Sequence, residues 1–135
     1  MDSNDNKLKH LDYIQQDIAR MASNSFLLKA WTVTLISALF ALAAKDADKN
    51  YVLVAFFPTG IFWFLDGYYL SQERLFRKLY DNVRLLDPIA VDFSMSTANV
   101  KDDKVTIVNA MFSLTLASFY VSLIILLGVI TVVKL

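Results

Sequence analysis

Three long apolar stretches dominate the pattern of hydrophobic and polar positions along the chain. Residues 30–44 and 51–65 each run for 15 residues without a charge, and residues 105–133 run for 29. A helix that crosses a bilayer needs about 20 mostly apolar residues. The third stretch is long enough alone, and the first two are long enough when each is extended past one charge, Lys29 or Asp66. The pattern therefore predicts three transmembrane helices, over residues 26–44, 51–71 and 108–132.

The first two predicted helices continue beyond their apolar stretches. Apolar positions recur at spacings of three and four over residues 11–42 and again over residues 65–86, which is typical of helices with one packed face. We therefore expect residues 1–25 and 72–87 to form helical extensions that pack against each other outside the membrane. An amphipathic helix lying flat on the lipid is the alternative for residues 1–25.

A non-helical segment is expected between the second and third membrane helices, at residues 88–104. The Asp87-Pro88 dipeptide predicts the end of the second helix, because proline disfavours helical geometry in the residue before it. Residues 90–96 alternate roughly as a strand does, although a single strand is unstable without a partner. The predicted fold is one all-α domain over residues 1–135: an integral membrane helical bundle with three transmembrane spans, long cytoplasmic helix extensions and one short irregular or β segment.

The distribution of basic residues predicts the orientation of this bundle. Ten Lys and Arg residues lie on the side of the N-terminus and residues 72–104, and three (Lys45, Lys49 and Lys134) lie on the other side. Basic residues near membrane helices favour the cytoplasmic side. We therefore expect a bacterial inner-membrane protein with a cytoplasmic N-terminus and a periplasmic or external C-terminus. The first span is expected to remain as an uncleaved anchor, since no cleavage pattern follows a short apolar core.

Two charges inside the predicted spans fall at the same depth. With residues 45–50 as the turn, Lys29 lies 15 residues below Ala44 and Asp66 lies 15 below Tyr51, which is about 22 Å at the helical rise. Intramembrane charges usually pair or line a cavity, so we expect an ion pair. The alternatives for Asp66 are an unpaired carboxylate that reaches the headgroups and a proton-relay or ion site. The same counting predicts two further pairs, Arg20 with Glu73 and Asp17 with Arg77.

A basic cluster follows the second span and is a candidate anion site. Its members would bind a nucleotide or phosphate between the cytoplasmic helices by charge-assisted hydrogen bonds. The alternative is ordinary positive-inside charge in contact with anionic lipid. The cluster comprises Arg74, Arg77, Lys78 and Arg84.

The third predicted span carries polar side chains in its first half and is almost wholly aliphatic after residue 122. Small polar residues often mediate helix packing in membranes. The alternative is a pore lining, in which a polar vestibule meets a hydrophobic constriction that gates by dewetting. Three helices cannot enclose a hydrated pore, so that alternative requires a homo-oligomer with closed symmetry. The candidate pore-lining residues are Asn109, Ser113, Tyr120, Leu123 and Leu127.

The sequence offers no pattern typical of an enzyme or a cofactor protein. Cysteine is absent, and the single histidine, His10, is expected to be solvated on the exposed flank of the first helix. No serine–histidine pair or second aspartate lies within the predicted spans to form a hydrolytic site. Metal-ligand spacing and a phosphate-binding glycine loop are also missing. We therefore expect no catalytic residues, no metal and no cofactor.

Three sequence blocks resemble a family of small bacterial membrane proteins: RMASNSFLLKAW (20–31), FWFLDGYYLSQERLFRKLYDNVR (62–84) and DFSM (92–95). The size and layout of the chain also resemble membrane effectors of antiphage systems, including Hailong-type channel effectors. That resemblance implies an oligomeric ion channel controlled by an oligonucleotide from a partner nucleotidyltransferase. It transfers no residue-level motif.

Three hypotheses follow for function. The first is a homo-oligomeric ion channel in the lipid bilayer, a defence effector gated by a cytoplasmic nucleotide or a partner. The second is a non-conducting membrane anchor or scaffold for a soluble partner. The third is a small proton-coupled transporter that uses Asp66.

Overall fold

The structure is a computed structural model that describes residues 2–46, 48 and 50–133; the predictions made at Lys49 and Lys134 lie outside them. Within these residues the chain is all-helical in class, as predicted, and contains no strand. Its α-helices and 3-10 turns, in chain order, are α1 (Ser3–Asp46), α2 (Asn50–Arg84), η1 (Pro88–Ala90), η2 (Ala98–Val100), α3 (Ile107–Met111) and α4 (Leu114–Val133).

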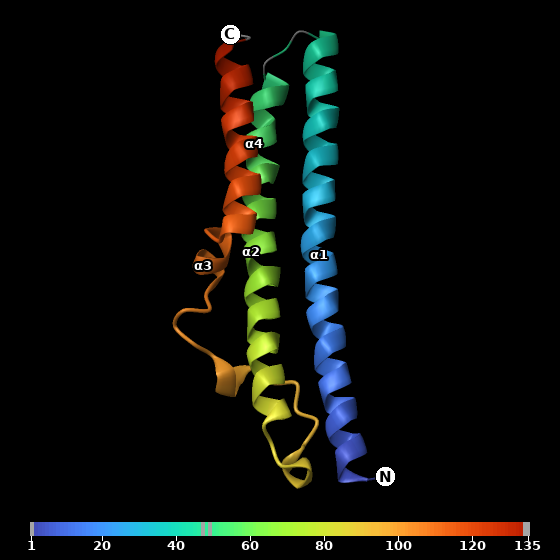
Figure 1. The fold of residues 1–135 in the computed structure, drawn as a ribbon. Coiled ribbons are helices and arrows are strands. Elements are labelled where there is room, and N and C mark those ends of the chain that lie inside the picture. The colour runs from blue at the N-terminus through green and yellow to red at the C-terminus, as the bar shows by residue number, and fades with distance from the viewer. Residues whose placement is uncertain (1, 47, 49, 134–135) are drawn as a thin grey trace.

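Helices α1 and α2 form a long antiparallel hairpin, and α4 packs beside the half of α2 that lies next to the hairpin turn (Figure 1). The last turn of α4 lies near that end of the hairpin, and the first turn of α1 lies at the opposite end of the molecule. With 44 residues, α1 is about 66 Å long at the helical rise. We call the half that holds residues 3–24 of α1 and 72–84 of α2 the stalk.

Helices α1, α2 and α4 are each long and apolar enough to cross a membrane. A hydrocarbon core is about 30 Å thick, so α1 is about twice as long as a span requires. The continuity of α1 and α2 follows from the unbroken apolar periodicity that the sequence shows. Helix α2 also continues through Pro58 without interruption.

Two apolar cores stabilise the hairpin, one in the stalk and one near the turn. The stalk core packs Ile14 and Ile18 of α1 against α2, with Val100 of η2 covering it. The second core joins all three long helices, since Leu127 of α4 packs with Ile36, Val52 and their neighbours. A polar layer between the two cores contains the candidate site.

The buried face of α1 departs from the predicted stripe toward the hairpin turn. The three-and-four spacing over residues 11–42 includes Leu35 and Leu42, but both are exposed, and Ile36 is buried instead. A straight helix with 3.6 residues per turn drifts relative to a three-and-four repeat. The apolar face therefore moves round the helix by one position over this length.

The predicted continuous helix over residues 108–132 is wrong, because a break at Phe112 and Ser113 divides it into α3 and α4. The Thr106 side chain caps the start of α3 by accepting from the Asn109 amide at 3.1 Å. Ser113 Oγ accepts from the Leu116 amide at 3.4 Å at the start of α4. These two caps satisfy amides that a continuous helix would bond internally.

Residues 90–96 alternate like a strand in sequence but are irregular in the structure. Of the two expected forms, irregular or β, the irregular one is observed. Backbone amides in this segment bond to side chains two residues earlier: Ser94 to Asp92 at 3.0 Å and Ser96 to Ser94 at 3.3 Å. Such local bonds replace ladder pairing. Phe93 adopts a φ of 58° between them, which is a left-handed conformation that few non-glycine residues adopt.

Candidate functional site

The candidate site is built around Asp66, whose side chain is fully buried in the polar layer between the two cores. Its carboxylate accepts three hydrogen bonds from two other helices. Lys29 Nζ donates at 2.6 Å and Tyr120 Oη donates at 2.9 Å, both to Oδ2. Ser25 Oγ donates to Oδ1. Asp66 therefore links α1, α2 and α4 through one charged group.

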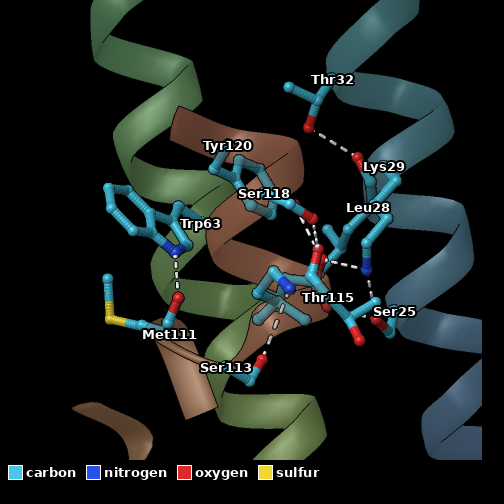
Figure 2. A network of polar contacts seen from close by, with 12 residues as sticks. Ser25, Leu28, Lys29, Thr32, Trp63, Met111, Ser113, Thr115, Ser118 and Tyr120 are labelled. Atoms are coloured by element: carbon cyan, nitrogen blue, oxygen red, sulfur yellow. Dashed lines mark hydrogen bonds and ion pairs between the residues drawn. The ribbon is translucent and has the colours of Figure 1, made fainter. Parts of the chain in front are cut away.

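The Lys29–Asp66 pair lies where equal depth along the two helices predicts it. Ser25 and Lys29 are four residues apart on one face of α1, and the ammonium also donates to Ser25 Oγ at 2.8 Å. Figure 2 shows these two α1 side chains directed toward the α4 residues around Tyr120. The sequence did not indicate the contributions of Ser25 and Tyr120. The only signal for them in the sequence was that both side chains can donate a hydrogen bond at about the depth of Asp66.

Aromatic packing covers the cluster from the side of α4. The ring of Trp63 stacks on Tyr120 with centroids 6.0 Å apart and planes 10° apart. Trp63 Nε1 also donates to the Met111 carbonyl at 2.8 Å (Figure 2). This bond satisfies a carbonyl at the end of α3 that the helix break leaves without a helical partner. Trp63 thus attaches α3 to α2 beside the charged cluster.

Gly67, next to Asp66, allows α3 to approach α2 closely. A Cβ at this position would meet the Met111 side chain and would lie 3.2 Å from the Ile107 carbonyl oxygen. The second contact is with backbone, which cannot move aside as a flexible side chain can. The absence of a side chain at position 67 therefore helps to place Trp63 and Tyr120 over the carboxylate.

The bonding pattern indicates a static charge pair. The carboxylate is an acceptor when ionised, and its two oxygens receive one ammonium and two hydroxyl groups. A buried charge is strongly destabilising unless it is paired and hydrogen-bonded. Within the described ranges, no three His, Cys, Asp or Glu residues lie close enough to hold a metal ion.

The two further ion pairs predicted between α1 and α2 do not form among the described side chains. Arg20 pairs with Asp17 at 2.7 Å, within α1. Arg77 pairs with Glu73 at 3.0 Å, within α2. Partners three or four residues apart on one helix need no interhelical register, and both arginines are more than half exposed. Local pairing therefore replaces the predicted cross-helix pairing.

The basic residues predicted as an anion site are mostly neutralised by acidic neighbours, and they do not surround one hollow. Lys78 pairs with Asp102 at 2.5 Å, and Arg84 pairs with Asp81 at 3.5 Å. Arg77 lines an open hollow of about 290 Å³ between α1 and α2, whereas Lys78 lines a separate one of about 610 Å³ against residues 99–103. Arg74 and Arg84 line neither of these two hollows. The structure therefore divides the predicted cluster of Arg74, Arg77, Lys78 and Arg84.

The Lys78–Asp102 pair connects the irregular segment to α2. The pKa of the Asp102 carboxyl is lowered below its usual value. The largest cause is the hydrogen bond that Lys78 donates, and the second is the hydrogen bond from the Lys104 amide. The ionised form is therefore the one that binds. This attachment is complete above the ordinary pKa of aspartate, near 3.9, and is lost as the pH falls through the lowered value.

The predicted pore lining contains residues that the structure buries inside the chain. Tyr120 and Leu127 are both fully buried, and Leu123 packs at the edge of the core near the turn. Ser113 is half-buried as a helix cap, and the exposed Asn109 donates to the Lys104 carbonyl at 2.7 Å. These residues therefore do not form one free face. The face of α4 that is exposed carries Thr115, Ser118 and Ser122.

His10 is the clearest residue that sequence reasoning placed wrongly. We expected a solvated side chain, but only 1% of His10 is exposed, and Nε2 lies 2.8 Å from the Ser94 carbonyl oxygen. Residues 91–96 fold back over the start of α1 and cover it. A contact across 84 positions has no periodic signal in the sequence.

Comparisons of the chain with protein-family models, with curated proteins and with solved structures found no match. The resemblance to small bacterial membrane proteins therefore stays a prediction. The site is described here by its own geometry.

Proposed function

We propose that the protein is an integral membrane protein that assembles into a homo-oligomeric ion channel lined by α4. Helices α1, α2 and α4 would cross the bilayer of a bacterial inner membrane, and the stalk would project into the cytoplasm. The observation that carries the proposal is the polar stripe on the free face of α4. It consists of Thr115, Ser118 and Ser122, all exposed.

The two opposite faces of α4 differ in what they contact. The buried face carries Leu116, Tyr120 and Leu127 and packs within the chain. The free face carries the three hydroxyl groups beside the exposed Leu114 and Val121, and it continues with the exposed aliphatic Ile125 and Val129. A polar vestibule that meets an aliphatic constriction is a known arrangement for gating by dewetting.

The exposed face of α2 differs from that of α4, which supports the idea that the two faces meet different surroundings. The exposed residues of α2 between positions 53 and 65 are large apolar or aromatic side chains, apart from Gly60. Such a face suits lipid contact. A hydroxyl-bearing face suits a neighbouring subunit or water, because hydroxyl groups favour interhelical contacts over lipid. Closed symmetry would bring the α4 faces of several subunits around one axis.

The Asp66 cluster would set the rotation of α4 in this assembly. Tyr120 lies on the face opposite to Ser118 and Ser122, and its bond to Asp66 holds that face inward. The free face is then directed away from the hairpin. We expect the charge pair to act by holding this geometry, because a single buried pair adds little net stability to a fold.

Control by a ligand or partner would act through the stalk and residues 88–104. The resemblance to antiphage effectors favours a nucleotide or oligonucleotide made by a partner nucleotidyltransferase. The two hollows beside Arg77 and Lys78 are the places where an anion would compete with Glu73 or Asp102 for the basic side chains. This defence role belongs to the proposal and depends on the resemblance.

Cysteine scanning of α4 tests the proposed lining directly, because the natural chain contains no cysteine. Purified variants are reconstituted in planar bilayers and exposed to a water-soluble, charged thiol reagent. We expect conductance in the unmodified protein, and its block at Ser118→Cys and Ser122→Cys. The matched controls are Leu116→Cys and Leu127→Cys, which face the core and should not respond. A protein that assembles but conducts no ions would contradict the proposal.

A non-conducting scaffold is the second candidate, and the end of the stalk favours it. Leu85 and Ile89 are 78% and 84% exposed there. From Asp66, α2 continues for 18 residues to Arg84, so these side chains lie about 27 Å further along the axis and are placed beyond lipid in the proposed orientation. A co-purifying soluble protein that Ile89→Ser releases, with no conductance, would support this function instead.

A further inference from the structure

His10 forms a buried connection between the start of α1 and the irregular segment. Its Nε2 atom lies 2.8 Å from the Ser94 carbonyl oxygen. Its ring lies 5.6 Å from the ring of Phe93, and Phe93 lies 6.2 Å from Tyr13. The neighbouring Met95 packs on the stalk core. Residues 91–96 are thus held on the stalk by the His10–Ser94 hydrogen bond and by apolar contacts.

The partner of Nε2 determines which imidazole nitrogen carries the proton. A carbonyl oxygen only accepts hydrogen bonds, so Nε2 must donate. In a neutral imidazole the other nitrogen, Nδ1, is then a bare acceptor. The Nδ1 atom is buried and has no hydrogen-bond partner among the residues that the structure describes. Protonation would place an N–H group there without an acceptor, and an unsatisfied charged donor is strongly destabilising in a buried position.

The charged groups around His10 are engaged elsewhere or exposed. Lys7 donates to the Leu86 carbonyl at 2.8 Å. Asp87 accepts from the Ile89 amide, and Asp92 accepts from the Ser94 amide. Arg84 pairs with Asp81. On α1 itself, Lys9 and Asp12 are exposed. None of these carboxylates bonds Nδ1, so none is in place to stabilise an imidazolium.

We propose that His10 and Ser94 form a pH-sensitive latch that holds residues 91–96 on the stalk while the imidazole is neutral. An ordinary histidine side chain protonates near pH 6.5. In the latched state an N–H group at Nδ1 would have no acceptor, whereas in the released state water could accept its hydrogen bond. Release is therefore favoured as the pH falls, and latching is complete above the ordinary histidine range.

The backbone at Phe93 favours release as well. Its φ of 58° is a conformation that strains a large side chain, and the Asp92 carboxylate and the His10 ring help to maintain it. Release would allow Phe93 to return to an extended conformation. The same segment continues through η2 to α3 and α4, so a change at His10 would reach the helix that carries the proposed pore face. The latch itself does not depend on the channel function.

The test uses the exposure of position 95 in the full-length protein in lipid nanodiscs. Met95→Cys reports release by its reaction with a thiol reagent, and Asn99→Cys, which is exposed, corrects for the pH dependence of the thiol. We expect the ratio of the two rates to rise about tenfold between pH 7.5 and pH 5.5, since one proton is bound on release. In chains that also carry His10→Gln the ratio should stay constant, because glutamine donates without titrating.

A second measurement keeps the test independent of any variant. His10 is the only histidine, so isotope-labelled histidine gives one set of ring nitrogen signals. We expect the tautomer protonated at Nε2 at pH 7.5, and imidazolium together with release at pH 5.5. A rate ratio that does not change with pH, or that changes equally in the His10→Gln chain, would overturn the latch. So would a ring protonated at Nδ1 at pH 7.5. The Lys78–Asp102 attachment titrates below this range and should not contribute.

Discussion

At the scale of single residues, the donors and acceptors of Asp66 decide between a static and a working carboxylate. Proton carriers in membranes are acidic side chains that also exchange protons with a path. Asp66 is fully buried, and both of its oxygens are occupied by donors from α1 and α4. This arrangement favours a structural pair over the proton-coupled transporter.

Asp66→Asn is expected to destabilise the folded protein by about 3 kcal/mol, because it leaves the Lys29 ammonium without its counter-charge. Reversible unfolding in mixed micelles measures the free energy of unfolding. Lys29→Met introduced into the same chain should recover part of the loss, since the unpaired charge is then removed. The control is Asp81→Asn, which breaks an exposed pair and should change stability by less than about 1 kcal/mol. Equal effects of Asp66→Asn and Asp81→Asn would show that the pair has no structural role, and would return the transporter to consideration.

At the scale of elements, close contact between α2 and α3 is a specific requirement of the polar layer. Gly67 provides the contact surface, and Trp63 provides the hydrogen bond that ends α3. Together they position the helix break just before α4 begins. The start of α4, and with it the height of Tyr120, depends on this contact.

Gly67→Ala is expected to destabilise the fold by about 1–3 kcal/mol, which is usual for overpacking. The added methyl group would press on the Ile107 carbonyl and displace α3 from α2. Gly60→Ala is a matched control, because nothing lies within 4 Å of a Cβ at Gly60 and alanine favours helix over glycine by about 1 kcal/mol. Thermal unfolding monitored by tryptophan fluorescence compares the two. If Gly67→Ala proved as stable as Gly60→Ala, the close approach of α3 would be incorrect.

The elements that the sequence predicted well are those with a long periodic signal. Both long helices and their antiparallel pairing were predicted, because their apolar spacing persists beyond the spans. The helix break at Phe112 and Ser113 was missed, since the apolar run carries no glycine or proline there to signal the end of a helix. The cover over His10 was missed because it depends on a distant turn, Asp92–Ser94, and on no local pattern.

At the scale of the whole molecule, the length of the hairpin exceeds what a bilayer can enclose. The two helices have 44 and 35 residues. A hydrocarbon core about 30 Å thick can surround only part of the length of each helix. The stalk has its own core, so it can stay folded outside the membrane. The molecule therefore combines helices long and apolar enough to cross a membrane with a stalk that has its own apolar core, and the Asp66 layer lies between the two cores.

The proposed orientation predicts that the hairpin turn and the N-terminus lie on opposite sides of the membrane. Asp48→Cys should react with a membrane-impermeant maleimide in spheroplasts, because it lies at the outer turn. Asp5→Cys should react only after the membrane is permeabilised. The ten-to-three distribution of Lys and Arg is the physical basis of this expectation. Labelling of Asp5→Cys in intact spheroplasts would reverse the orientation and place the stalk outside.

The sequence by itself determined the helical class, the three apolar segments and the pairing of Lys29 with Asp66. Each follows from composition or from counting along regular helices, where one residue always advances the chain by the same rise. Only the tertiary structure decided which face of α4 is free, which basic residues are already neutralised, and what covers His10. Those outcomes depend on side chains from distant elements that meet in one place, and the periodicity of a single helix carries no information about them.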